Sequence, residues 1–238
     1  AAYAVIAYQT AYLKTYYPHE FFAASMSMEL SNQKKLSEFY EELKRLNIEI
    51  VRPDINKCFS DFTSNGKQFF YALGAIKNVG YEAISNIVKE RETNGEYKNL
   101  SDLIKRVDPK DINKLQLEGL VRAGAFDNLN DNRQSIYNSI PNIILKSKNN
   151  FENKQANQFD LFNDKLSNEE NILDDIEDWN IEIRLTKEFE TLGFYISDHP
   201  LNQYKSIFDQ YNIVSYDNFQ NDENLLSSNI ACTVLKIQ

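Results

Sequence analysis

The sequence predicts a mainly α-helical protein with a small β element. Apolar and aromatic residues recur at helical spacing over most of the 238 residues. The period changes near residues 48–73, where apolar residues alternate and a Ser-Asn-Gly-Lys turn separates two aromatic runs. No apolar run approaches the roughly 18 residues that span a bilayer, so we expect no membrane partner.

The helices and strands follow from these patterns in chain order. Pro18 ends the first helix and suits the first turn of the second, because its fixed φ is compatible with a helix start. Helices are expected over residues 1–14, 18–30, 31–46, 83–88, 100–104, 115–121, 133–146, 179–192 and 201–211. Strands are expected at residues 48–51, in a hairpin of 59–62 with 69–73, and at 229–237. Both ends of the chain fall inside a regular pattern, which predicts that it is part of a longer protein.

The negative charge of the chain is concentrated in one region. The formal net charge is −9, yet residues 1–135 hold 18 basic and 18 acidic residues, whereas residues 136–238 hold 8 and 17. A neutral module can still hold phosphate through backbone amides, while the acidic part should avoid nucleic acid. Residues 147–178 are rich in Asn, Asp and Glu, which predicts an acidic linker. Its run Asp174–Asp178 is expected to be solvated.

No catalytic constellation is present in the sequence. Two-metal phosphoryl transfer needs clustered carboxylates such as Asp-x-Asp, and the chain has none. His19 and His199 lack a second metal ligand at a usable spacing. Cys58 and Cys232 lie far apart, which favours a reducing, cytoplasmic location over a disulfide. We therefore expect neither a metal nor another cofactor in this chain.

A first motif, Leu73–Ile84, predicts a tight turn followed directly by a helix. In helix-hairpin-helix modules the amides of such a turn and the next helix N-terminus converge on a DNA phosphate. The turn needs a residue with positive φ, and Asn78 is the most tolerant residue after glycine. Lys77, Asn78, Val79 and Gly80 are the candidate DNA contacts. A plain helix-start turn explains the pattern equally well.

A second turn lies about 44 residues further on, at Leu120–Asp127. Two such turns in tandem form a four-helix module that holds the DNA backbone without reading bases. Arg122, Ala123 and Gly124 are its candidate contacts. Gly124 as a helix C-cap, with Phe126 packing back, is also compatible with this segment.

A third motif, Gln158-Phe159-Asp160-Leu161-Phe162, lies inside the linker. A glutamine followed by Leu-Phe is what sliding-clamp pockets accept, because two apolar side chains fill a cleft and the glutamine bonds at its rim. The alternative is that Leu161 and Phe162 only anchor the linker to the protein itself.

Together these motifs resemble the alpha subunit of bacterial DNA polymerase III, the family C replicative polymerase. The resemblance is carried by AYAVIAYQTAYLKTYYP (2–18), YALGAIKNVGYEAISNIV (71–88), LVRAGAFDNL (120–129) and EFETLGFYISDHPL (188–201). It departs at Asn78, where the family usually has glycine, and at the bulky Phe159.

The resemblance implies a domain order. Residues 1–66 correspond to the rear of the fingers domain and 67–146 to a tandem helix-hairpin-helix module. The acidic linker 147–178 carries the clamp-binding peptide, and 179–238 lead into a truncated OB domain, with its first strand at the end. The catalytic aspartates and their Mg²⁺ belong to an upstream palm, so this chain should be inactive alone. Implied partners are primer–template DNA, the sliding clamp and other replicase subunits.

Two other interpretations remain open from the sequence. A DNA-repair protein or nuclease subunit could use the same hairpins, although a nuclease needs metal-binding carboxylates. A structural adaptor whose hairpins never touch DNA is favoured by the acidic balance. Salt-dependent binding to duplex DNA separates the polymerase part from the adaptor.

Overall fold

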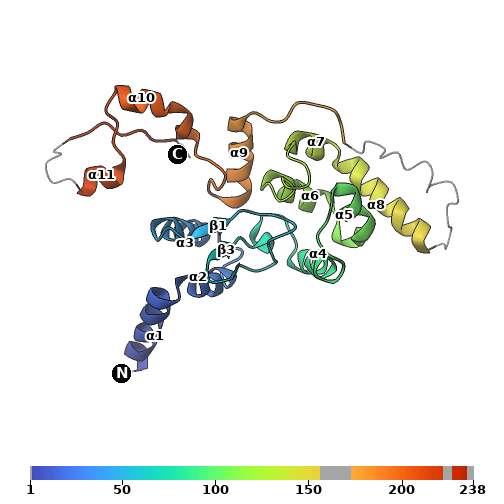
Figure 1. The fold of residues 1–238 in the computed structure, drawn as a ribbon, viewed down its shortest axis with the longest axis horizontal. Coiled ribbons are helices and arrows are strands. Elements are labelled where there is room, and N and C mark those ends of the chain that lie inside the picture. The colour runs from blue at the N-terminus through green and yellow to red at the C-terminus, as the bar shows by residue number, and fades with distance from the viewer. Residues whose placement is uncertain (1, 156–172, 222–226, 235–238) are drawn as a thin grey trace. The chain divides into compact units, whose positions relative to one another are not determined.

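The computed structural model describes residues 2–155, 173–221 and 227–234, which form two compact units, 1–194 and 195–238. The prediction of a mainly helical fold with a small β element is confirmed (Figure 1). The helices of the first unit are α1 (Ala2–Tyr16), α2 (Pro18–Ser27), α3 (Gln33–Arg45), α4 (Tyr81–Asn94), α5 (Leu100–Arg106), α6 (Lys114–Arg122), α7 (Arg133–Asn138), α8 (Ile140–Gln155) and α9 (Ile181–Leu192), with short 3₁₀ helices η1 (Leu73–Ala75) and η2 (Pro109–Asp111).

A three-stranded sheet follows the first three helices in the sequence and precedes α4. Its order is β1 (Glu49–Val51), β3 (Gln68–Phe70), β2 (Thr63–Ser64). β2 and β3 form the predicted hairpin, with Thr63 opposite Phe70, whereas β1 pairs with β3 in parallel. The first hairpin strand was expected at residues 59–62 and is wrong by position. The amide of Phe62 bonds to Ser27 Oγ at 3.1 Å, which takes this residue away from the ladder.

A partly buried loop, residues 52–62, connects the sheet to the helices that follow. Arg91 of α4 is buried and donates from Nη1 to the carbonyl oxygens of Ile55 and Cys58, each at 2.7 Å. The Ile55 amide bonds to the Ala125 oxygen at 2.8 Å. Burial raises the pKa of the Cys58 thiol to about 12, so this cysteine is a packing residue and not a nucleophile.

The helix expected over residues 133–146 is two helices. Ser139 ends α7, and Pro141 stands in the first turn of α8, where its missing amide costs no hydrogen bond. α8 then continues to Gln155, so residues 147–155, which were expected in the linker, are helical. The reason is packing, because Ser147 is buried where α8 lies against α5.

The acidic run Asp174–Asp178 keeps Asp174, Asp175 and Glu177 exposed, as expected of a solvated segment, yet its backbone is held in place. We call residues 174–179 the strap, because it is hydrogen-bonded along α7. Asn132 Nδ2 donates to the Ile176 oxygen at 2.6 Å, and Ser135 Oγ donates to the Asp174 oxygen at 2.5 Å. Asp178 Oδ1 accepts from the Gln134 amide at 3.0 Å. Polar side chains at the start of α7 therefore hold the strap.

The second unit is small. It contains η3 (Pro200–Tyr204), α10 (Lys205–Gln210) and α11 (Tyr216–Asn221), close to the helix expected at 201–211. The strand expected at 229–237 is absent from its described part, residues 229–234, where Asn229 forms a single bridge with Ile213. Ile230 and Val234 are exposed, so no packing fixes an extended conformation there.

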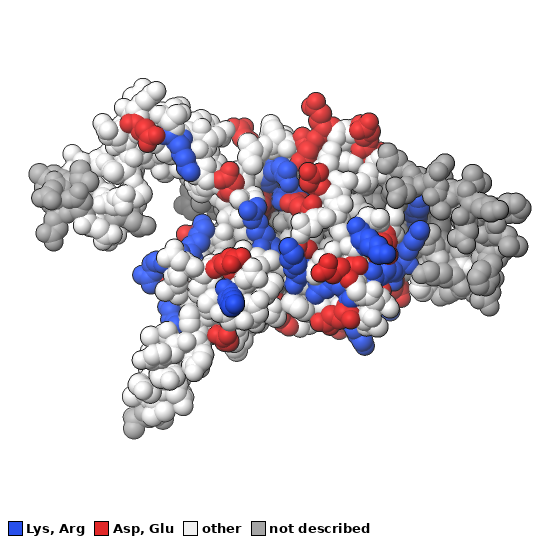
Figure 2. Space-filling view, viewed as in Figure 1, with Lys and Arg blue, Asp and Glu red and all other residues white. Residues whose placement is uncertain are grey.

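Helix α1 is apolar and yet exposed along its length. Tyr3, Ile6 and Tyr8 are 89%, 58% and 70% exposed, and Lys14 is the only charged residue in the helix. Figure 2 shows the helix almost free of charged side chains. Exposed apolar surface of this extent promotes association in water.

We therefore expect the Ile6→Glu/Tyr8→Lys variant to self-associate less than the parent chain, because charge on this surface opposes its burial. Sedimentation velocity over a micromolar concentration series measures this. The control, Gln9→Lys, changes an exposed polar position of the same helix and should behave as the parent. A parent chain that stays monomeric across the series contradicts the prediction.

Candidate nucleic-acid interface

The first predicted turn has the expected backbone. η1 is followed by Asn78 with φ 66°, and α4 begins at Tyr81 with Gly80 as its N-cap. The prediction of positive φ at Asn78 is confirmed. Gly80, however, has φ −76° and ψ 128°, which any residue can adopt, and a Cβ there would lie 3.9 Å from Ala83 Cβ. The protein itself therefore does not require a glycine at position 80.

The amides of this turn divide into two groups. Lys77 N–H bonds to the Thr191 oxygen at 3.3 Å and Val79 N–H to the Ile76 oxygen at 3.1 Å. The amides of Gly80, Tyr81 and Glu82 form no hydrogen bond within the described residues, and all three residues are exposed. The N-terminus of a 14-residue helix therefore presents free donors together with its partial positive charge.

Charges around the first turn are mixed. Lys77 is exposed and forms no ion pair within the described residues. The Tyr81 hydroxyl donates to Asp61 Oδ2 at 2.5 Å, and this hydrogen bond raises the pKa of the phenol. Glu82 adds a second carboxylate. Over the face drawn in Figure 2, cations and carboxylates are likewise interspersed.

Two glycines that were not predicted from the sequence as site residues allow close backbone packing around the turn. A Cβ on Gly119 of α6 would lie 2.7 Å from the Lys77 oxygen, and one on Gly74 would lie 2.6 Å from the Ser60 oxygen. Both distances are too short for any side chain. Only because these residues are glycine can α6 contact the turn backbone at Lys77, and the loop between β1 and β2 contact η1 just ahead of the turn. A glycine inside an apolar helical pattern was the signal available for Gly119.

The second predicted turn is a helix cap. Gly124 has φ 79°, its amide bonds to the Val121 oxygen at 3.0 Å, and the Ala125 amide bonds to the Leu120 oxygen at 2.9 Å, which is a Schellman motif. Phe126 is buried as that interpretation expects. The space that a side chain at Gly124 would need is filled by the Arg133 guanidinium.

The predicted contact residues therefore separate into exposed and covered ones. Lys77, Asn78 and Gly80 are exposed, and Arg122 is partly exposed. Val79, Ala123 and Gly124 are buried, and the amides of the last two are used inside the chain. The two turns are thus unequal: the first offers backbone donors, and the second offers the Arg122 side chain.

A buried charge network joins the second turn to α9. Arg133 is almost fully buried, with Nη2 2.6 Å from Asp127 Oδ2 and Nη1 3.6 Å from Glu188 Oε2. Burial disfavours the guanidinium charge, but the hydrogen bond to Asp127 and the charges of Asp127, Glu188 and Asp178 together outweigh it and raise the pKa of Arg133. Arg184 Nη1 extends the network to Asp178 of the strap at 2.9 Å. Removing one partner would leave a buried charge uncompensated.

The candidate clamp peptide, Gln158–Phe162, lies outside the described residues. The strap follows this peptide in the sequence and is attached to α7 by the bonds given above. In addition, Asp174 N–H donates to Ser139 Oγ at 3.0 Å.

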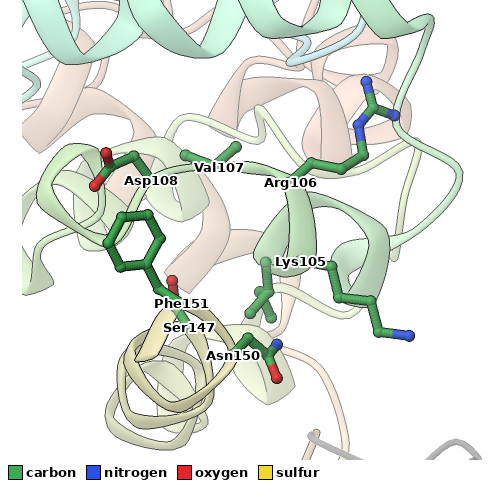
Figure 3. Close-up of a pocket in the computed structure, with 8 residues that line it drawn as sticks. Lys105, Arg106, Val107, Asp108, Ser147, Asn150 and Phe151 are labelled. Carbon is green, nitrogen blue, oxygen red and sulfur yellow. The ribbon is translucent and has the colours of Figure 1, made fainter. Parts of the chain in front are cut away.

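A pocket of about 360 Å³ lies on another part of the first unit, between the end of α5 and α8 (Figure 3). Ile104, Val107 and Phe151 form its apolar wall. Ser147 Oγ and Asn150 Nδ2, which line it, have no hydrogen-bond partner within the described residues. None of the predicted contact residues lines this pocket.

Two further kinds of feature are absent from the described residues. They contain no group of three or more His, Cys, Asp or Glu residues arranged to hold a metal ion. Likewise, none of the described helices is both long enough and apolar enough to cross a membrane.

Comparison with known proteins gives a consistent family. Residues 47–136, which include both turns, match the helix-hairpin-helix motif. The chain is 41% identical to DNA polymerase III subunit alpha of Caulobacter vibrioides over 84% of its length, and 39% identical to that of Borreliella burgdorferi over 89%. It is 35% identical to that of Campylobacter jejuni over its whole length. The chain spans about a fifth of the length of these relatives.

The contact at Gly119 can be tested against a glycine that the fold does not need. Gly119→Ala should lower the free energy of unfolding by about 1–3 kcal/mol, because the clash with the Lys77 oxygen outweighs the better helix propensity of alanine. Gly80→Ala, the matched control, should cost less than about 1 kcal/mol, the scale of an N-cap change. Urea unfolding followed by circular dichroism measures both. Equal costs for the two variants contradict the account.

Proposed function

The chain belongs to the DNA polymerase III alpha subunit family, and on that premise we propose that it holds the backbone of duplex DNA during chromosomal replication without catalysing nucleotide transfer itself. One observation carries the proposal: the free amides of Gly80, Tyr81 and Glu82 open to solvent directly after the Asn78 turn. Backbone donors at a helix N-terminus suit a phosphate oxygen and carry no sequence information.

The glycine at position 80 supports the same function. Since neither its φ nor a neighbouring atom requires glycine, its use is to leave the approach to the free amides open. The geometry of the turn depends instead on Asn78, whose φ is positive. Lys77 adds a charge-assisted contact beside the amides.

The expected binding is weak and independent of sequence. Few uncompensated cations surround the turn, so few counterions are released and salt dependence is shallow, with a slope of log K against log salt of roughly −2 to −4. Stable attachment to DNA therefore needs a second tether. We propose that Gln158–Phe162 supplies it by docking on the sliding clamp; the sequence of this peptide is the support for that step.

The remaining proposals concern the cellular setting. We propose other replicase subunits as further partners, which would bind a longer polypeptide that includes this chain. We propose a cytoplasmic location, because Cys58 is a buried free thiol and the only other cysteine of the sequence, Cys232, lies far from it along the chain, which suits a reducing compartment. A structural adaptor without DNA contact is the competing function, favoured by the acidic residues of 136–238.

DNA binding at the first turn is tested with Gly80→Val. Valine is compatible with the backbone angles at this position but covers the free amides, so affinity for a short duplex should fall by about 1–2 kcal/mol while the fold is kept. Fluorescence anisotropy over a salt series measures affinity and slope. Thr93→Val, an exposed position at the other end of α4, is the control and should bind as the parent.

Two results would contradict the proposal. A parent chain that shows no salt-dependent binding to duplex DNA favours the adaptor. Unchanged affinity in Gly80→Val, with Thr93→Val also unchanged, removes DNA contact from the first turn.

Clamp docking is tested with Leu161→Ala/Phe162→Ala. Burial of the two side chains contributes about 1.5–3 kcal/mol each and is opposed by ordering of the peptide, which gives a micromolar-class site near −8 kcal/mol at best. Calorimetry against the cognate clamp should therefore detect binding of the parent chain and no binding of the double variant. Leu166→Ala, outside the motif, is the control. Equal heats for all three, or none for the parent at high micromolar concentration, leave the motif a chance match.

A further inference from the structure

Two cations converge on one aromatic ring beside the second turn. The Arg122 guanidinium carbon lies 5.3 Å and Lys187 Nζ lies 5.4 Å from the centre of the Tyr137 ring. Arg122 Nη2 also donates to the Tyr137 hydroxyl at 2.8 Å. Lys187 Nζ lies 4.7 Å from the centre of the Trp179 ring as well. Cation–π contacts thus hold both side chains beside the Tyr137 ring.

Neither cation is closely neutralised. Lys187 forms no ion pair within the described residues. Arg122 has Glu118 and Glu190 only at 4.0 Å, whereas the buried Arg133 is 2.6 Å from its carboxylate. The Arg122 Nε atom is buried and has no partner among those residues. Two like charges around one ring repel each other, and an anion between them would relieve that repulsion.

The two cations lie close to the first turn through the helices that carry them. Lys187 stands four residues before Thr191 on α9, so both share a helix face, and the Thr191 oxygen accepts the Lys77 amide. Arg122 ends α6, which meets the first turn at Gly119. The Tyr137 cluster and the first turn are therefore held by the same two helices.

Nearby carboxylates limit what the cluster can bind. Asp178 of the strap is engaged by Arg184 and by the Gln134 amide. Asp174, Asp175 and Glu177 are partly or fully exposed and oppose a long anionic contact. A cation already lies over the ring of Tyr137 and over that of Trp179, where an unpaired base would have to compete with it. The surface thus suits a single backbone phosphate better than a single strand with stacked bases.

We propose that Lys187 and Arg122 form the second phosphate contact of this module, and that Tyr137 and Trp179 position them. The inference rests on the proposed binding of duplex DNA at the first turn. It assigns the second contact to side chains, in place of the turn amides that the Gly124 cap uses internally.

The test is a salt series with duplex DNA, followed by fluorescence anisotropy on the full chain. Lys187→Gln should weaken binding severalfold and reduce the slope of log K against log salt by about 1, as expected for one lost phosphate contact. Glu190→Gln should strengthen binding, since it removes a carboxylate beside Arg122. Lys98→Gln removes an exposed lysine ahead of α5 and is the control.

The positioning role of Trp179 has its own readout. Trp179→Leu should weaken binding in the parent background but not in Lys187→Gln, because both changes remove the same contact. Trp179→Phe should restore part of the loss. A role in folding alone would weaken both backgrounds equally, and that result overturns the positioning assignment.

Failure of this inference differs from failure of the proposed function. If Gly80→Val weakens binding while Lys187→Gln keeps both the affinity and the slope of the parent, the second contact is overturned and the first turn stands. If the parent itself binds no duplex DNA, both are overturned. A reduced slope in Lys187→Gln with an unchanged Lys98→Gln supports the second contact.

Discussion

The close approach of α6 to the first turn is the constraint on which the rest of the module depends. At Gly119 the helix backbone meets the Lys77 carbonyl at a distance that leaves no room for a side chain. From the other side, the end of α9 accepts the Lys77 amide at Thr191. Held between two helices, the turn can keep Asn78 at positive φ and direct the free amides of α4 outwards. Preorganisation of this kind lowers the cost of binding, because the donors need not be ordered when a phosphate arrives.

The buried ion pairs explain why the two turns differ. Arg133 occupies the space beside Gly124 and bonds to Asp127, and together with Glu188 it ties the second turn to α9. A turn whose amides and side-chain space are filled from inside cannot also receive a ligand on its backbone. Its contribution is to fix α9, and α9 in turn fixes the first turn. The two turns have similar sequences, but the first presents backbone donors and the second stabilises the position of α9.

Local chemistry was predictable from the sequence, and tertiary contacts were not. Asn78 at positive φ, a helix start directly after Gly80 and the end of α9 at Leu192 follow from residue types at fixed positions. The docking of the strap on α7 and the extension of α8 were not predicted, because an Asn- and Asp-rich composition resembles a solvated linker whether or not α7 offers it partners. The burial of Ala123 and Gly124 could likewise not be predicted from the sequence, since a capping turn and a phosphate-binding turn have the same sequence pattern. The missing strand at residues 229–234 shows the same limit, because alternation predicts a strand only where another strand pairs with it.

The central claim is that duplex DNA is held by the backbone of the first turn and not by that of the second. The most direct test is an amide NMR titration of the labelled chain with a short duplex. The account predicts that the amides of Gly80, Tyr81 and Glu82 shift with rising DNA concentration, while those of Gly124 and Ala125, bonded inside the cap, do not. Equal shifts at both turns, or shifts at the second turn alone, would contradict it.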